Sequence, residues 1–321
     1  MDKLMAEFIK NVELGKVQKF GGMSVIPLFS VDDSHYYLTL KEAMETHLIT
    51  VTELDQQARV PELKVINQAD VPVLILDGEE LAGAKQNRVL NTTILLKENS
   101  ETVIPVSCTE QGRWRYTSNK FRDSGVVAAH RIRHTNLKSV SRSLRNTGKY
   151  QSDQIAVWNA IDDLSDEAHV LSQTRAMRDV YQDHVQNLEE YLKSFPVLPS
   201  QKGLLIIQGR NIVGLDMLSS SQAYSLLHEK LVKSYSMDAL FQEDKSTSED
   251  LDKLAVNFMN DVQKSSEEKH PSIGYGYDYR FNTEYSMGSA LIHQDQVVHA
   301  AFFCKEEGNR NLSGYKARRI Y

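Results

Sequence analysis

A dense group of polar side chains follows the apolar run 71–76, which has the composition of a buried strand. Residues 77–88 hold three acids, two amides and two bases. Because burying a polar group is costly unless it is paired, such a segment is either a solvated loop or a site. Glu79 could act as a general acid or base. Donors for a ribose or a phosphate follow it, namely Lys85, Gln86, Asn87 and Arg88.

A second polar segment, 108–114, follows the apolar run 103–106. Glu110 is a second candidate acid or base, and Arg113 a candidate phosphate ligand. Cys108 is a candidate nucleophile if a cation such as Arg113 lowers its pKa, and otherwise a small buried residue. Trp114 could stack on a base or cover the core. Because binding residues gather in loops at strand ends, the two segments together favour a site.

The charge distribution points to an anionic partner. Residues 113–149 hold ten Lys or Arg and one acid, a net charge of +9, which leaves −15 for the rest of a chain of net charge −6. Arg131 and Arg133 could hold a diphosphate, although a basic loop paired with acids elsewhere is an equal alternative. We expect a small anionic, nucleotide-like ligand, because the acidic remainder would repel a long nucleic acid.

Metal and cofactor motifs are weak or missing. His130 and His134 are spaced for one helix face, but the arginines between them oppose a cation, so we predict no metal site. Asp216 lies in an apolar strand and should have a structural partner or a ligand to bind, whereas His299 has the setting of a core histidine. The chain has no phosphate-loop, dinucleotide or nucleophile-elbow motif; the segment 274–277 is a partial match only. No cofactor is specified.

The elements that must position these residues follow from periodicity. Short apolar runs between turn residues predict a β-rich sandwich or barrel-like unit over 1–116. Residues 117–150 lack clear periodicity and predict a long ordered loop. Between 152 and 195 we expect a helix capped by Ser152 and then one long helix, ended by Pro196.

The C-terminal part is mixed. We expect a hairpin around 209–211, a helix opened by Ser220, another from near Thr247, and a closing hairpin at 294–295. The fold class is therefore α+β, with a β-rich N-terminal unit, central helices and a mixed part with antiparallel hairpins. The predicted domains are 1–116, 117–200 and 201–321, or one intertwined domain.

Composition limits the class of protein. Two cysteines exclude a disulfide framework and fit a reducing compartment. The N-terminus lacks a signal-peptide core, and no apolar run is long enough to span a bilayer. We expect a cytoplasmic protein without a membrane partner; a homo-oligomer stays open.

The sequence resembles a poorly characterised family, the ADP-ribosylglycohydrolase- and rhodanese/phosphatase-associated protein domain family. The matching segments are spread over most of the chain: 78–79 with 83–88, 105–110 with 112–114, 154–158, 214–216, and 288–291 with His299. The resemblance implies a role near NAD or ADP-ribose metabolism. It brings no catalytic residue set, reaction or fold.

Three functions follow from these residues. The first is an enzyme acting on an ADP-ribose-like or related nucleotide-sugar phosphate, with Glu79, Glu110 and Cys108 as candidate catalytic groups. The second is a binding or sensing module for such a ligand, which needs the arginines and Trp114 but not the carboxylates. The third is a scaffold whose helices over 152–195 bind a partner protein.

Overall fold

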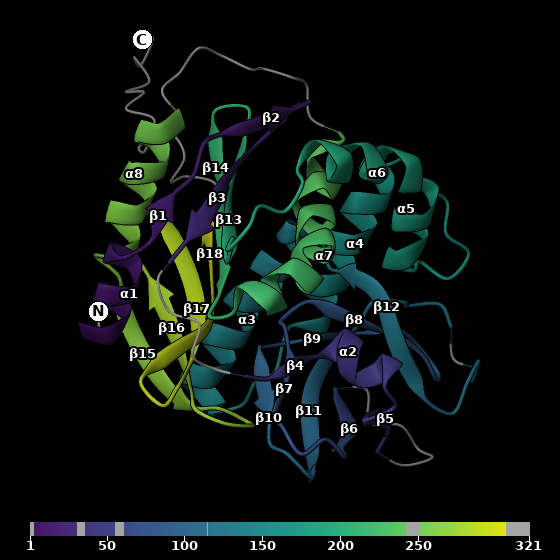
Figure 1. The fold of residues 1–321 in the computed structure, drawn as a ribbon. Coiled ribbons are helices and arrows are strands. Elements are labelled where there is room, and N and C mark those ends of the chain that lie inside the picture. Colours follow the sequence, from purple (N-terminus) through teal and green to yellow (C-terminus); the bar gives the residue numbers. More distant parts are fainter. Residues whose placement is uncertain (1–2, 31–35, 55–60, 114, 242–250, 306–321) are drawn as a thin grey trace.

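The computed structural model describes residues 3–30, 36–54, 61–113, 115–241 and 251–305. It confirms the predicted α+β class (Figure 1). Every pair of strands described there is antiparallel except β4 with β7. Within the described residues, no helix is long and apolar enough to cross a membrane.

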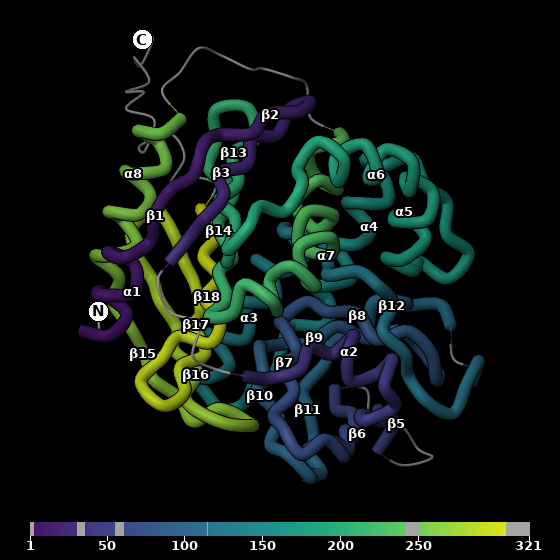
Figure 2. The backbone as a smooth tube through the Cα atoms, viewed as in Figure 1, coloured from purple at the N-terminus to yellow at the C-terminus, as the bar shows by residue number. Residues whose placement is uncertain are grey.

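The first layer is a nine-stranded sheet, here called the large sheet. Both ends of the chain contribute to it, so N-terminal and C-terminal strands share one sheet (Figure 2). Its strands, in pairing order, are β1 (Glu13–Leu14), β3 (Met23–Phe29), β13 (Gly203–Gln208), β14 (Asn211–Leu218), β18 (Gln296–Cys304), β17 (Ser286–His293), β16 (Tyr277–Asn282) and β15 (Ser266–Pro271), with β2 (Gln18–Phe20) paired to β3.

Helices cover both faces of the large sheet (Figure 1). On one face α1 (Lys3–Lys10) and α8 (Leu251–Val262) bury their apolar sides. On the other face α7 (Ser221–Ala239) packs against the sheet. The central strand β13 is buried at every position, as expected for a strand covered on both faces.

The second layer is a curled unit of short strands, here called the β-rich unit, with its own apolar core. A three-stranded sheet and a six-stranded sheet contribute to that core, and α2 (Leu40–Glu45) closes one side with a Thr39–Glu42 capping box. The strands are β4 (Leu38–Thr39), β7 (Val73–Ile75) and β10 (Ile94–Leu96) in the first sheet, and β5 (Ile49–Glu53), β6 (Glu62–Asn67), β11 (Ser100–Cys108), β9 (Arg88–Leu90), β8 (Glu79–Gly83) and β12 (Phe121–Val127) in the second.

The prediction of a loop over 117–150 is wrong. The segment forms strand β12 and helix α3 (His130–Thr147). Polar side chains on the buried face of α3, including Arg133 and Asn136, obscure the apolar repeat, because they are paired inside the fold rather than solvated.

The helical region 152–195 is broken more often than predicted. Asp153, not Ser152, caps α4 (Gln154–Glu167). The expected long helix is instead a loop followed by α5 (Met177–Asp183) and α6 (Val185–Ser194), which meet at His184. Apolar residues continue at spacings of three and four across this break, so the sequence pattern gave no sign that the helix is interrupted.

The predicted C-terminal elements are mostly confirmed. The β13–β14 hairpin forms, and Ser220 caps α7 by accepting a hydrogen bond from the backbone N–H of Ala223. The β17–β18 hairpin turns at Gln294 and Asp295, both at positive φ. The start expected near Thr247 lies outside the described residues, and β9, β15 and β16 were not predicted.

Candidate functional site

The two polar segments singled out in the sequence meet at the end of β9 and β11. Glu110 accepts hydrogen bonds from Arg113 at 2.6 Å, from the Thr174 hydroxyl at 3.0 Å, and from the backbone N–H of Asn87 at 3.3 Å. Gln86 donates to the backbone carbonyl of Glu110 at 2.8 Å. The structure brings these segments together, and most of their polar groups satisfy one another in what we call the turn network, although Nε and Nη2 of Arg88 have no hydrogen-bond partner among the described residues.

Arg113 and Arg88 are occupied within the turn network. Arg113 donates to the backbone carbonyls of Gly83 and Ala84 besides Glu110. Arg88 is completely buried and donates to Gln86 Oε1 at 3.1 Å. Both guanidinium groups thus hold the chain between β8 and β9 in place.

Two further candidates, Cys108 and Lys85, lie around this network. Cys108 is completely buried, and burial raises the pKa of its thiol, which opposes the thiolate form. Gln154 contacts the backbone N–H and carbonyl of Cys108 at 2.7 and 2.9 Å. Lys85 Nζ lies 5.1 Å from the ring centre of Tyr116. Trp114 lies outside the described residues.

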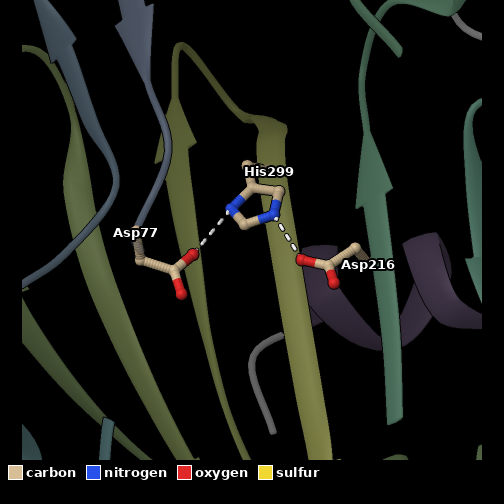
Figure 3. Close-up of side chains that lie close together, drawn as sticks. All are labelled: Asp77, Asp216 and His299. Carbon is tan, nitrogen blue, oxygen red and sulfur yellow. Dashed lines mark hydrogen bonds and ion pairs between the residues drawn. The ribbon is translucent and has the colours of Figure 1, made fainter. Parts of the chain in front are cut away.

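Arg133 and Asp216 lie together in a second, central ion-pair cluster, defined by Asp77, Arg133, Asp216 and His299. Figure 3 shows three of its members, Asp77, Asp216 and His299. Arg133 donates to Asp216 at 2.6 and 2.8 Å and to Asp77 at 3.0 and 3.1 Å. His299 Nε2 lies 3.1 Å from Asp216. The Tyr235 hydroxyl also donates to Asp216 at 2.6 Å. The cluster joins the β-rich unit, α3, α7 and the large sheet.

Protonation in the central ion-pair cluster favours charged carboxylates. Burial by itself raises the pKa of Asp77 and Asp216, but the Arg133 guanidinium and His299 outweigh it, so both pKa values lie below their usual range. The cluster is therefore a buried, hydrogen-bonded pairing of opposite charges.

The central ion-pair cluster also has the spacing of a metal site, since ligand atoms of Asp77, Asp216 and His299 lie within 4.8 Å of one another. However, Arg133 donates to Oδ1 of both aspartates, which are the oxygens nearest His299. A fixed positive charge on those oxygens repels a divalent cation. These residues fit an ion-pair cluster better than a metal site.

Arg131 lies elsewhere on α3. It forms ion pairs with the completely buried Asp238 and, at 2.7 Å, with Glu167. His130 contacts the same Asp238 carboxylate. Acids of α7 and α4 therefore balance part of the positive charge of the basic segment. This is the alternative that the sequence left open.

A cavity of about 370 Å³ lies between α2, β12 and α7, here called the β12 cavity. A volume in this range suits a small-molecule site. A β-bulge interrupts the pairing of β12 with β8 between Asp123 and Val127, and Gly125 at the bulge has φ +81°. Bulges redirect side chains and occur often beside active sites. Here the bulge carries Asp123 and Ser124 into the cavity lining.

The floor of the β12 cavity is a charged chain of three residues. Lys230 of α7 donates to Glu79 at 2.6 Å and to Asp123 at 2.7 Å. Burial by itself lowers the pKa of Lys230, but the two carboxylates raise it above its usual range, so the ammonium keeps its proton. One ammonium offsets only one of two carboxylates. Burial, together with the Asp123 charge, therefore raises the pKa of Glu79 despite Lys230.

Glu80 is a fourth ionisable group beside this floor. Successive strand residues point to opposite faces, so Glu80 faces away from Lys230. Its Oε1 accepts a hydrogen bond from Thr109 at 2.8 Å, while its buried Oε2 has no hydrogen-bond partner among the residues described. Burial raises its pKa to about 7, opposed in part by the Thr109 and Ser124 hydroxyls. Glu80 is thus an acid able to exchange a proton near neutral pH.

The two candidate acids Glu79 and Glu110 lie in different sites. Glu79 contacts Lys230 below the β12 cavity, whereas Glu110 is bound within the turn network, and the two share no hydrogen-bond partner in the described part of the chain. Four residues of the cavity region were missed, namely Glu80, Asp123, Ser124 and Lys230. Glu80 could have been found, because side chains alternate along the strand 79–83 and its carboxylate must therefore lie on the opposite face from that of Glu79. Asp123 could not have been found in this way, because it lies in the segment that was predicted to be a loop.

The fold and these sites define an α+β protein with two buried charged centres and a cavity beside one of them. Residues 11–303 match the family described as ARG and Rhodanese-Phosphatase-superfamily-associated Protein domain, and the chain belongs to that family. No curated protein and no solved structure matches the chain.

Proposed function

We propose that this chain is an enzyme that hydrolyses an ADP-ribose-like nucleotide sugar in the β12 cavity. One observation carries the proposal: the cavity floor holds the chain Asp123–Lys230–Glu79, with the proton-exchanging acid Glu80 next to Ser124 of the lining. The family name supports the substrate class, because ARG denotes ADP-ribosylglycohydrolase, and it associates the domain with that enzyme and with rhodanese-phosphatase proteins.

The residues of the β12 cavity have distinct roles in this proposal. Cleavage of a ribosyl bond builds positive charge on the sugar, and a fixed carboxylate stabilises that charge. Asp123 lines the cavity and is the carboxylate placed to contact the sugar or to take a proton from the attacking water. Lys230 holds Asp123 by a hydrogen bond and is itself held by Glu79, so both act as positioning residues.

Glu80 supplies the other proton step. Its pKa of about 7 allows it to carry a proton at neutral pH, and Ser124, whose hydroxyl acts on Glu80, is also a lining residue of the cavity. We therefore assign proton delivery to the leaving group to Glu80 acting through Ser124. Lys41 and Arg122 on the cavity wall add positive charge for a phosphate.

This proposal gives the turn network another role. Glu110, Arg113, Gln86 and Asn87 shape the chain from 83 to 88 that follows Glu79 and Glu80 in β8. Cys108 takes no part, because a buried thiol of raised pKa is a poor nucleophile.

The test is turnover of NAD, ADP-ribose and ADP-ribose phosphates, followed by chromatography of the products. We expect wild-type protein to hydrolyse at least one compound and Asp123→Asn to lose about 100-fold or more in kcat. The control Asp163→Asn changes an exposed aspartate of α4 and should keep full activity. Binding of ADP-ribose without turnover by wild type would favour a sensing module instead. Equal activity of the two variants would exclude Asp123.

A further inference from the structure

A second hollow, with a volume of about 460 Å³, lies where the β15–β16 and β17–β18 turns meet the end of β10. These turns lie together at the lower left of the molecule (Figure 1). We call it the tyrosine groove. It shares no lining residue with the β12 cavity, and aromatic rings and ammonium groups dominate its lining: Tyr275, Tyr277, Tyr279, His293, Lys97 and Lys269.

The turn that carries the tyrosines is built tightly. A Cβ on Gly274 would lie 2.1 Å from the Leu95 carbonyl oxygen, and one on Gly276 would lie 2.2 Å from the Ile292 carbonyl oxygen. Gly276 also has φ +82°, which favours glycine. The backbone N–H of Tyr275 donates to the Leu95 carbonyl at 2.8 Å. The turn is therefore fixed against the β-rich unit and holds its tyrosines in a defined position.

The rings form a platform with cations beside it. Tyr275 stacks on His293, with ring centres 4.8 Å apart and planes at 22°. Lys97 Nζ lies 5.3 Å from the centre of the Tyr275 ring. Lys269 Nζ lies 4.0 Å from the centre of the Tyr277 ring, yet 48% of Tyr277 is exposed. A planar ligand can therefore reach Tyr277 while an attached anion reaches the lysines.

We propose that the tyrosine groove binds a nucleoside monophosphate, with its base stacked on Tyr277 and its phosphate held by Lys97 and Lys269. Stacking on aromatic rings is the common way to bind a base without reading its edges. Ammonium groups hold phosphate as point charges. This proposal is independent of the hydrolase function, since it concerns other residues.

Charge selects a short ligand over a polymer. The lining holds two lysines and one carboxylate, Asp295, and Glu98 accepts a hydrogen bond from the Tyr275 hydroxyl at 3.1 Å, so the groove offers cations to one phosphate without a large excess of positive charge. The chain as a whole has a net charge of −6, which opposes binding of a long polyanion. Its effect on a single phosphate in the groove is small, because salt screens charges that lie more than about 10 Å away. A mononucleotide satisfies both conditions.

Calorimetric titration with AMP, adenosine and ribose 5-phosphate tests the proposal. AMP should bind more tightly than either fragment, because only AMP uses both rings and lysines. Tyr277→Ala should weaken AMP binding about 5- to 150-fold, the range for loss of one stacked base, and leave ribose 5-phosphate unchanged. Lys269→Met should weaken both phosphates.

Two controls locate the binding. Tyr36→Ala removes a tyrosine that is 66% exposed and lies outside the groove, and it should leave AMP binding unchanged. Leu226→Trp narrows the β12 cavity and should also leave AMP binding unchanged, which separates this proposal from the hydrolase function. Equal effects of Tyr277→Ala and Tyr36→Ala, equal affinity for AMP and ribose 5-phosphate, or no AMP binding at millimolar concentration would overturn the proposal.

Discussion

Replacing Arg133 by Met should destabilise the protein strongly. Arg133 is 1% exposed and makes four hydrogen bonds to Asp77 and Asp216, both of which are buried. Met keeps much of the packing against Phe303 but leaves the two carboxylates without their main cation. Removing one partner of a buried ion pair costs about 3–5 kcal/mol, because the remaining charge stays buried.

The assay is urea unfolding of wild type, Arg133→Met and the control Arg145→Met, followed by circular dichroism. Arg145 lies on the same helix and pairs with Glu268, but the two side chains are 53% and 41% exposed. An exposed pair contributes at most about 1 kcal/mol, so the control should stay close to wild type. A loss for Arg133→Met no larger than for Arg145→Met would refute the reasoning.

The loss should also depend on pH with a defined sign. The pKa values of Asp77 and Asp216 are depressed in the folded protein, so wild type gains stability from these groups above their unfolded pKa of about 3.9. That contribution disappears as the pH falls through the folded pKa values. In Arg133→Met the buried carboxylates take up protons instead. The difference between the two proteins should therefore shrink below about pH 4, and a constant difference would contradict the assignment.

The remaining predictions concern single groups. Burial holds the Glu80 pKa at about 7, so the folded protein loses stability as the pH rises above the unfolded pKa of about 4.3. In unfolding titrations, the free energy of unfolding of Glu80→Gln should therefore rise by roughly 2–3 kcal/mol relative to wild type between pH 5 and pH 8. A difference between the two proteins that does not change with pH would contradict the raised pKa. The buried Cys108 thiol should react with Ellman's reagent only after denaturant is added, measured in a Cys304→Ser background; fast labelling of folded protein would contradict its burial. Gly276→Ala should lower the melting temperature far more than Gly125→Ala, because a Cβ at Gly276 meets a carbonyl oxygen at 2.2 Å, whereas Gly125 faces open space and loses about 1 kcal/mol to its φ of +81°; equal shifts would show that the β17 carbonyl gives way.

Local patterns predicted the elements whose residues contact mainly their neighbours in sequence. The β13–β14 hairpin and the Ser220 cap follow from alternation and from a single side chain at a helix start. Helix α3 failed this reading because its buried face carries Arg133, whose partners are 56 and 83 residues away. A reading of short sequence segments cannot include partners that are so far away along the chain.

The site was predictable to a similar degree. Two polar segments after successive strands indicated a site, and the structure brings Gln86 and Glu110 together, but the sequence did not show that these segments meet. The same reasoning could not show that the acids at 79 and 80 enter different environments, because that depends on Lys230 of a distant helix and on a bulge in β12. The domain boundaries 1–116, 117–200 and 201–321 stay a prediction.

The most direct test of the central claim is the thermal shift produced by ADP-ribose in wild type and in Leu226→Trp, which places a bulky ring in the β12 cavity. At about 100 times the dissociation constant, a ligand of the folded state adds about 2.7 kcal/mol of stability. The account predicts a rise in melting temperature of several degrees for wild type and for the control Tyr36→Trp, and a clearly smaller rise for Leu226→Trp, in which only the tyrosine groove can still bind the adenosine phosphate end of the ligand. The same shift in all three proteins, or none in wild type, would contradict it.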